Sequence, residues 1–79
     1  MKYIMFEDFA GEPVPVIFPN RIGFEEMREQ IPYASVLSAG FVQVRGGAFV
    51  CHGEAKELQA RARAGDGPVL DAKFAAPED

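Results

Sequence analysis

The sequence predicts a small α+β domain, in which an antiparallel sheet of four or five strands (a ββαββ core) packs with one main helix and a short C-terminal helix. Two pairs of apolar segments are joined by short Gly-containing turns, as in β-hairpins. A single stretch between them has helical periodicity. At 79 residues the chain makes one domain, 1–79, with a modest core and residues 76–79 as a frayed tail. We expect one helix or two to cover one face of the sheet.

The first hairpin is expected near the N-terminus. Residues 2–9, KYIMFEDF, are rich in aromatic and branched side chains and predict a strand. The Gly and Pro of residues 10–13 predict a turn, and VPVIFP, residues 14–19, predicts the second strand. Because Pro15 has no N–H for the ladder, this strand should lie at an edge of the sheet or expose that position.

The main helix is predicted over residues 20–31, NRIGFEEMREQI. Asn20 is the expected N-cap, and Pro32 ends the helix. Gly23 weakens the first turn and leaves room for a later start. Three apolar residues fall on one face at i, i+3 and i+7: Phe24, Met27 and Ile31.

The second hairpin is expected after a linker of small residues, 33–40. The segments FVQV and AFVCH flank Gly46 and Gly47, which can both adopt positive φ in a two-residue turn. Residues 57–64, ELQARARA, have helix-forming residues but a strand-like alternation, so both alternatives stay open, with a narrow preference for a strand. Pro68 marks the start of the short C-terminal helix over VLDAKF.

The adjacent Cys51 and His52, the chain's one cysteine and one histidine, are the first residues to suggest chemistry. The two-residue turn sets a register in which they point to opposite faces. Cys51 should share a face with Val42, Val44 and Phe49. His52 should share the other face with Phe41, Gln43 and Arg45. The two side chains therefore cannot form a catalytic thiolate–imidazolium pair, and Cys51 is expected as a small core residue.

No catalytic, cofactor-binding or metal-ligating residue is predicted. One Cys and one His are too few ligands for a structural zinc site. Neither Ser35 nor Ser38 lies in a nucleophile-elbow pattern. We therefore do not expect an enzyme.

The charge of the chain argues against a nucleic-acid partner and leaves two interpretations open. The acids bind a basic surface on another protein, or the negative charge only keeps a small domain in solution. The net charge is −4 and the pI about 4.9, and residues 1–31 carry six acids and three bases. Phosphate contacts need Lys and Arg, so direct nucleic-acid binding is not expected. The lone cysteine favours a reducing compartment, and the sequence contains no signal peptide or membrane span, so we expect a cytoplasmic protein.

Two surfaces are candidates for binding that partner. The first, here called the acidic strip, joins carboxylates of the first hairpin to those of the main helix, where it would imitate DNA phosphates against a basic groove: Glu7, Asp8, Glu12, Glu25, Glu26 and Glu29. The second is an open sheet face with exposed apolar side chains, suited to a partner or to self-association: Tyr3, Met5, Phe41 and Val50.

A resemblance adds to this interpretation. The stretches MKYIMFE, PVIFP, SAGFV and CHGE, in that order and near that spacing, resemble a group of small proteins encoded in bacteriophages and prophages. Those proteins typically continue with a Gly-Glu-Ser run, a strand and an Arg-Pro-Glu-Asp helix start. Here Ala55 replaces the Ser, and Ala and Gly replace the Arg-Pro pair. The resemblance implies a mobile-element origin and a strand after Glu54, and it implies no catalytic residues.

Small acidic phage proteins of this kind include inhibitors of host defence, anti-CRISPR proteins among them. The resemblance, together with the small size, the acidity and the missing catalytic set, therefore implies a non-enzymatic inhibitor of phage type. It would block a host nucleic-acid-binding complex, most concretely a CRISPR effector, by occupying a basic DNA-binding surface. The alternative is a small structural or regulatory subunit that acts as a homodimer through an exposed sheet face.

Overall fold

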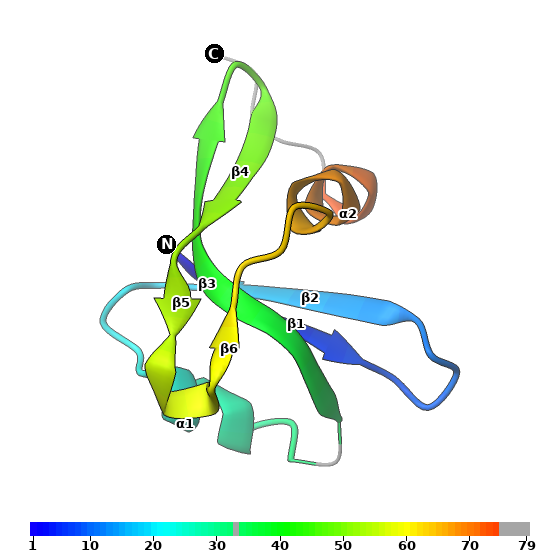
Figure 1. Ribbon diagram of the computed structural model, residues 1–79, viewed down its shortest axis with the longest axis vertical. Coiled ribbons are helices and arrows are strands. Elements are labelled where there is room, and N and C mark those ends of the chain that lie inside the picture. The colour runs from blue at the N-terminus through cyan, green and yellow to red at the C-terminus, as the bar shows by residue number, and fades with distance from the viewer. Residues whose placement is uncertain (33, 75–79) are drawn as a thin grey trace.

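The computed structural model of the protein describes residues 1–32 and 34–74 (Figure 1). It is an α+β fold, as predicted. An antiparallel sheet has the strand order β2-β1-β3-β4. Its strands are β1 (Lys2–Glu7), β2 (Pro13–Phe18), β3 (Ser35–Arg45) and β4 (Ala48–His52). A second sheet has two strands, β5 (Glu54–Ala55) and β6 (Ala60–Arg61), with the 3-10 turn η1 (Lys56–Leu58) between them. The two helices are α1 (Phe24–Glu29) and α2 (Asp66–Lys73). The expected tail, 76–79, lies outside the described residues.

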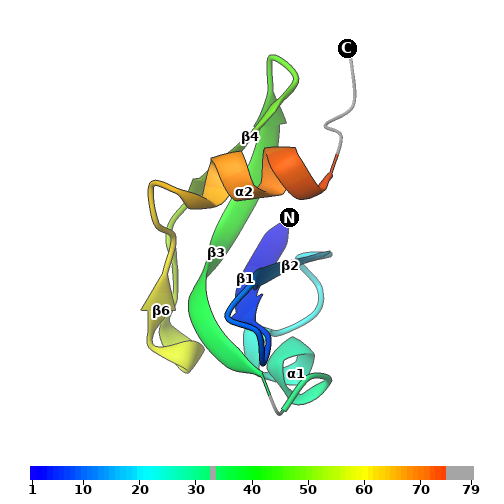
Figure 2. The same ribbon diagram turned by 90° about the vertical axis from the view of Figure 1, so that its right-hand side faces the viewer.

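The two helices cover opposite faces of the sheet, whereas the sequence predicted one covered face. Figure 2 shows α2 above β1 and β2, and α1 below them. Leu70 of α2 packs with Tyr3 and Met5 on one face, and Phe24 of α1 packs with Ile4 on the other. The expectation of an open face that includes Tyr3 and Met5 is therefore wrong, since both residues are fully buried. Phe41 and Val50 were expected on the same face as these residues. Phe41 instead packs with the cluster on the other face, and Val50 is 38% exposed.

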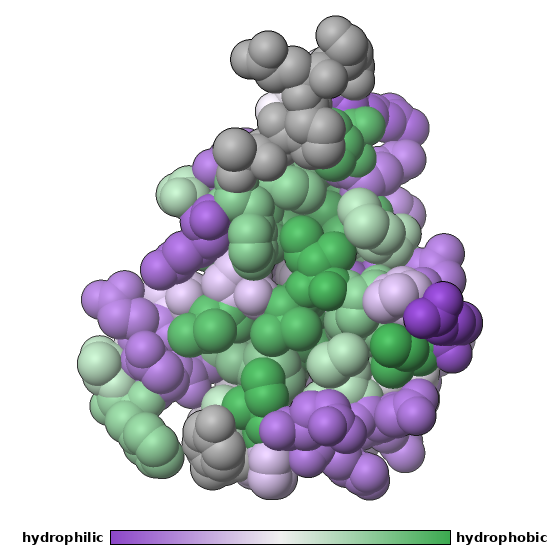
Figure 3. Space-filling view, turned by 180° about the vertical axis from the view of Figure 1, so that it is seen from behind, coloured by the Kyte–Doolittle hydropathy of each residue, from purple (hydrophilic) through white to green (hydrophobic). Residues whose placement is uncertain are grey.

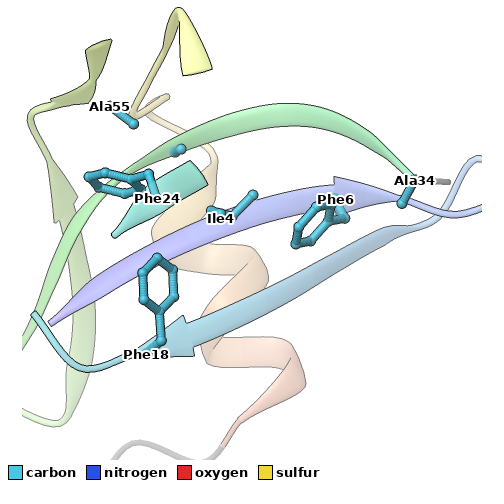
Figure 4. Close-up of a cluster of buried hydrophobic side chains, with 7 residues drawn as sticks. Ile4, Phe6, Phe18, Phe24, Ala34 and Ala55 are labelled. Carbon is cyan, nitrogen blue, oxygen red and sulfur yellow. The ribbon is translucent and has the colours of Figure 1, made fainter. Parts of the chain in front are cut away.

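Aromatic rings organise the core between α1 and the sheet. The close-up in Figure 4 shows Phe18 and Phe24 beside Ile4. The Phe18 and Phe24 rings meet edge to face with centroids 5.8 Å apart, and Phe24 and Phe41 do the same at 5.8 Å. Such a ring pair is worth about 0.5–1.5 kcal/mol beyond its buried area. Ala55 and Leu58, from the β5–β6 segment, complete the cover of this face.

The second hairpin confirms its predicted turn and register. Gly46 and Gly47 have φ of 56° and 79°, values that a residue with a side chain rarely adopts. Arg45 pairs with Ala48, and Val42 with Cys51. The turn residues therefore fix which side chains of β4 face each core.

Strand β3 begins earlier than the sequence predicted. The small residues of 33–40 suggested a linker, yet β3 starts at Ser35 and is the longest strand. A Cβ on Gly40 would lie 2.7 Å from the carbonyl oxygen of His52 and 3.3 Å from the Cβ of Ala62. Gly40 therefore has to be glycine because the chain at His52 and Ala62 passes close to β3. In the sequence, small residues that serve such close packing cannot be distinguished from those of a linker.

The helix α1 is shorter than the predicted 20–31. It begins at Phe24, and Gly23 rather than Asn20 is its N-cap residue. The Gly23 N–H donates to Glu26 Oε1 at 3.4 Å, so a side chain in the first turn satisfies that backbone group. The later start that Gly23 allowed is confirmed, and the predicted apolar residues Phe24, Met27 and Ile31 pack in one core cluster.

The segment 57–64 is neither a regular strand nor an α-helix. It contains the end of η1, then Gln59 with φ of 54°, and then the two residues of β6. The preference for a strand is correct only for Ala60 and Arg61. The C-terminal helix begins at Asp66, earlier than predicted, with Pro68 in its first turn. Within the part of the chain that the structure describes, no helix has the length and apolar character needed to cross a membrane.

Candidate protein-binding surface

Cys51 and His52 point to opposite faces of the sheet, as predicted. Cys51 packs against the α2-side core, which contains Val42 and Phe49. His52 is exposed and stacks on Phe41, with ring centroids 6.1 Å apart. The two side chains are therefore held apart by the pleat of β4. Burial raises the pKa of the Cys51 thiol to about 11, so at neutral pH it is protonated and a poor nucleophile.

A buried polar cluster joins the N-terminal strand to the C-terminal helix. The Tyr3 hydroxyl donates to Asp66 Oδ2, and both side chains are almost fully buried. Asp66 also accepts the Arg63 backbone N–H at 3.0 Å and faces the Arg63 guanidinium, with Nε 3.5 Å from Oδ1. Burial and the bond to Asp66 raise the pKa of Tyr3 far above its ordinary value. The Tyr3–Asp66 contact is closed to solvent and ties the two elements together, while the Arg63 side chain at its edge is 52% exposed.

Sequence reasoning missed Asp66. An Asp beside Gly and Pro at a helix start is typical of a solvent-exposed cap, and nothing local marks it as buried. Its partner Tyr3 lies 63 residues away in the chain. Only the return of α2 across the sheet brings the two together.

The six carboxylates of the acidic strip fall into two separate groups. Figure 1 places the β1–β2 turn at the right of the molecule and α1 at the lower left. Glu7 ends β1, and Asp8 and Glu12 lie in the turn that follows it, whereas the other group consists of the three glutamates of α1, at 25, 26 and 29. The structure therefore divides the acidic strip into two groups of three carboxylates, and only the hairpin group borders the cavity described next.

The hairpin carboxylates border an apolar cavity of about 200 Å³, here called the hairpin pocket. Its apolar lining comes from the hairpin and from the chain after α1: Phe6, Phe9, Val14, Ile31 and Ala34. Glu7 and Asp8 line the same cavity. Phe6 forms a buried floor, while Val14 is 39% and Phe9 91% exposed. Sequence reasoning found the acids but not the cavity, because its walls come from distant segments.

A second apolar hollow, the sheet groove, lies on the α2 side of the sheet where α2 leaves it uncovered. It has a volume of about 560 Å³. Its lining comes from the N-terminus, β2, the second hairpin and the end of α2: Met1, Pro15, Val16, Ile17, Val44, Phe49 and Phe74. Figure 3 shows hydrophobic side chains in a band across this part of the molecule, where β2 runs. Met1 is 49% and Phe74 39% exposed.

The free edge of β2 offers few donors to another strand. Met1 and Val42 exchange both backbone hydrogen bonds, at 3.3 and 2.8 Å, which shows that odd-numbered residues at the start of the chain bond to β3. The even residues of β1 therefore bond to β2, and their partners there are even as well. The backbone groups that point away from β1 therefore belong to the odd residues of β2: Pro13, Pro15 and Ile17. Since proline has no N–H, Ile17 is the one outward backbone donor within β2.

The edge of β4 is closed in a different way. The outward N–H of Phe49 donates to Asp71 Oδ1 at 2.9 Å. Gly67 lies so close that a Cβ there would be 2.7 Å from the Phe49 carbonyl oxygen. Helix α2 therefore lies against this edge. Since neither edge offers a free ladder, binding by strand addition is disfavoured, and side-chain surfaces are the candidates that remain.

Comparisons with protein-family models, with curated proteins and with solved structures found no match to this chain. The phage resemblance therefore stays a prediction from the sequence.

Proposed function

We propose that this protein is a non-catalytic inhibitor of phage type, which binds a basic, nucleic-acid-binding surface of a host complex such as a CRISPR effector. The observation that supports this most is the β1–β2 hairpin, where carboxylates surround exposed apolar side chains. Glu7 and Asp8 line the hairpin pocket, and Phe9 is 91% exposed at its rim. Such a surface has both the charge that a basic groove attracts and the apolar area that a protein partner can desolvate.

The two parts of this surface contribute differently to binding. Carboxylates at a rim mainly speed association and add salt dependence. Affinity comes from a few large side chains that become fully desolvated, and aromatic residues are prominent among them. Phe9 and the pocket beside it are suited to the second role, and the hairpin acids to the first. The hairpin acids would repel a nucleic acid, because phosphates and carboxylates are both negatively charged.

The proposal is tested by the plaquing of a phage on bacteria whose CRISPR immunity targets that phage. Expression of the protein should restore plaquing, and the purified protein should displace DNA from the purified effector. The double substitution Glu7→Gln and Glu12→Gln should weaken effector binding by about tenfold, equal to about 1.4 kcal/mol. Asp8 is left unchanged because it holds the turn.

The matched control removes the same charge from α1, by Glu25→Gln and Glu29→Gln. This variant should bind like the unmodified protein. If no CRISPR type is inhibited and no effector is bound, the proposed function is wrong. If the α1 variant loses binding and the hairpin variant does not, the function stands but its surface is the other carboxylate group.

The sheet groove supports a second candidate, a subunit that acts as a homodimer. Met1 and Phe74 are partly exposed apolar residues at a large hollow, and a second copy would cover them. A stable dimer needs about 1,000 Å² or more of buried surface. Light scattering of the purified protein distinguishes the candidates. A dimer that Phe74→Lys converts to a monomer supports the subunit, whereas a concentration-independent monomer rejects it.

A further inference from the structure

We propose that the hairpin pocket receives one apolar side chain of the partner protein, and that Lys or Arg flanks this side chain in the partner's sequence. The inference rests on the proposed function and specifies its partner. It follows from the size of the pocket, the rigidity of its rim and the charge around it.

The pocket is the size of one side chain. Small-molecule sites are usually about 300–1,000 Å³, and this cavity is about 200 Å³. Its floor is the buried Phe6, and Val14 stands at its side with 39% exposure. A single aliphatic side chain that enters it would replace water over Val14 and Ile31, which is the contact that gives a central anchor its energy.

The rim of the pocket is held in place before any partner binds. Asp8 Oδ1 accepts the backbone N–H groups of Ala10 and Glu12, both at 2.9 Å. The Asp8 N–H donates to the Glu12 carbonyl at 3.0 Å, and Gly11, with φ of 81°, donates to the Asp8 carbonyl at 3.1 Å. Binding therefore does not have to order this turn, and the entropy cost of association falls accordingly.

The charge around the pocket selects what flanks the anchor. Glu7, Asp8 and Glu12 contribute three negative charges to the hairpin end. A cation also lies near the floor: the Arg28 guanidinium is 5.9 Å from the centre of the Phe6 ring and donates to the Ile31 carbonyl at 2.6 Å. The side of the pocket is thus net acidic, so basic residues beside the anchor gain energy and acidic ones lose it.

The inference is tested by NMR titration of the full chain with three synthetic peptides. The first is Ac-Gly-Arg-Leu-Arg-Gly-NH2, the second replaces Leu by Ala, and the third replaces both Arg by Glu. The first should give saturable amide shifts at residues 6–9, 14, 31 and 34. Each replacement should weaken binding by about tenfold, because each removes either the anchor or the complementary charge.

The chain offers a matched pair of variants. Val14 and Val50 are both strand valines, 39% and 38% exposed, and Val50 lies away from the pocket. Val14→Lys should weaken binding of the first peptide by about tenfold or more, and Val50→Lys should leave it within about twofold. Thermal unfolding of both variants checks that they fold.

Failure of the inference can be told apart from failure of the proposed function. If the Leu and Ala peptides bind equally, if shifts centre on α1, or if no peptide binds, the pocket does not take an apolar anchor. If the Val14→Lys variant still inhibits the host complex as well as Val50→Lys does, the function stands without this pocket. If the first peptide binds the pocket but no effector is inhibited, the inference stands and the proposed function is wrong.

Discussion

Asp66 connects the two ends of the chain directly, because its carboxylate accepts the hydrogen bond from Tyr3 of β1. Asp66→Ala would leave the buried Tyr3 hydroxyl without its acceptor, which costs about 1–3 kcal/mol of unfolding free energy. Tyr3→Phe removes the donor and leaves Asp66 with the Arg63 contacts, so it should cost about 1 kcal/mol. Urea unfolding of both variants and of the double variant measures their coupling, expected at about 0.5–3 kcal/mol. Additive effects would show that the contact is not a tie.

Cys51 is expected to be slow to alkylate despite its partial exposure. Burial raises its pKa from 9.0 to about 11, so the thiolate fraction at pH 8 falls roughly a hundredfold below that of an ordinary thiol. The iodoacetamide rate should therefore be low at pH 8 and keep rising toward pH 11. The same thiol in urea-unfolded protein is the control, and its rate should reach half its maximum near pH 9 and level off above it. Equal rates in the folded and unfolded protein would contradict the burial argument.

The prolines of β2 are expected to keep this edge strand from pairing with another chain. Pro15→Thr would restore an outward N–H beside that of Ile17, giving the edge two spaced donors. Its predicted effect is a rise in average mass with concentration, measured by light scattering. Val14→Thr is the control, since the backbone groups of residue 14 bond to β1. Its average mass should not rise with concentration more than that of the unmodified protein. If both variants behave alike, the prolines do not protect the edge.

The elements differ in how far their sequences predict them. The second hairpin follows from two adjacent glycines, because a two-residue turn fixes the register of both strands locally. The start of β3 could not be predicted, because its small residues are typical of a linker. Gly40 is small because the His52 carbonyl oxygen and the Ala62 Cβ lie close to it, and those contacts form only in the folded protein. The cover that α2 gives to the second face also has no local signal, because the Tyr3–Asp66 contact spans 63 residues.

Some features of the candidate site also follow from the local sequence, whereas others depend on the tertiary structure. The hairpin acids were predicted by charge alone, but their separation from α1 and their place beside a cavity depend on tertiary structure. Ile31, the last of the apolar residues on the predicted helix face, lies beyond the end of α1 and lines the pocket beside Val14. A local pattern can identify a residue as apolar, and the fold decides whether it packs in the core or lines a cavity at the surface.

The molecule as a whole is expected to unfold as one unit, because β1 lies at the centre of both cores. Ile4 and Phe6 pack toward α1, while Tyr3 and Met5 pack toward α2. Neither α1 nor α2 can detach from the sheet without exposing one face of β1 to water. Domains of this kind have about 0.05–0.15 kcal/mol of stability per residue, so half the molecule has little chance of standing alone.

Native-state hydrogen exchange measures this directly. The amides of Tyr3 and Met5 bond to β3, and their opening free energy should equal the global value from urea unfolding. The Phe74 amide, which bonds to the Leu70 carbonyl at 2.8 Å, tests whether the end of α2 opens with the sheet. Fraying at that end alone lowers its protection without affecting β1. If the Tyr3 amide instead exchanges at a free energy well below the global value, then α2 detaches as a separate unit, and the Tyr3–Asp66 contact is too weak to couple the two cores.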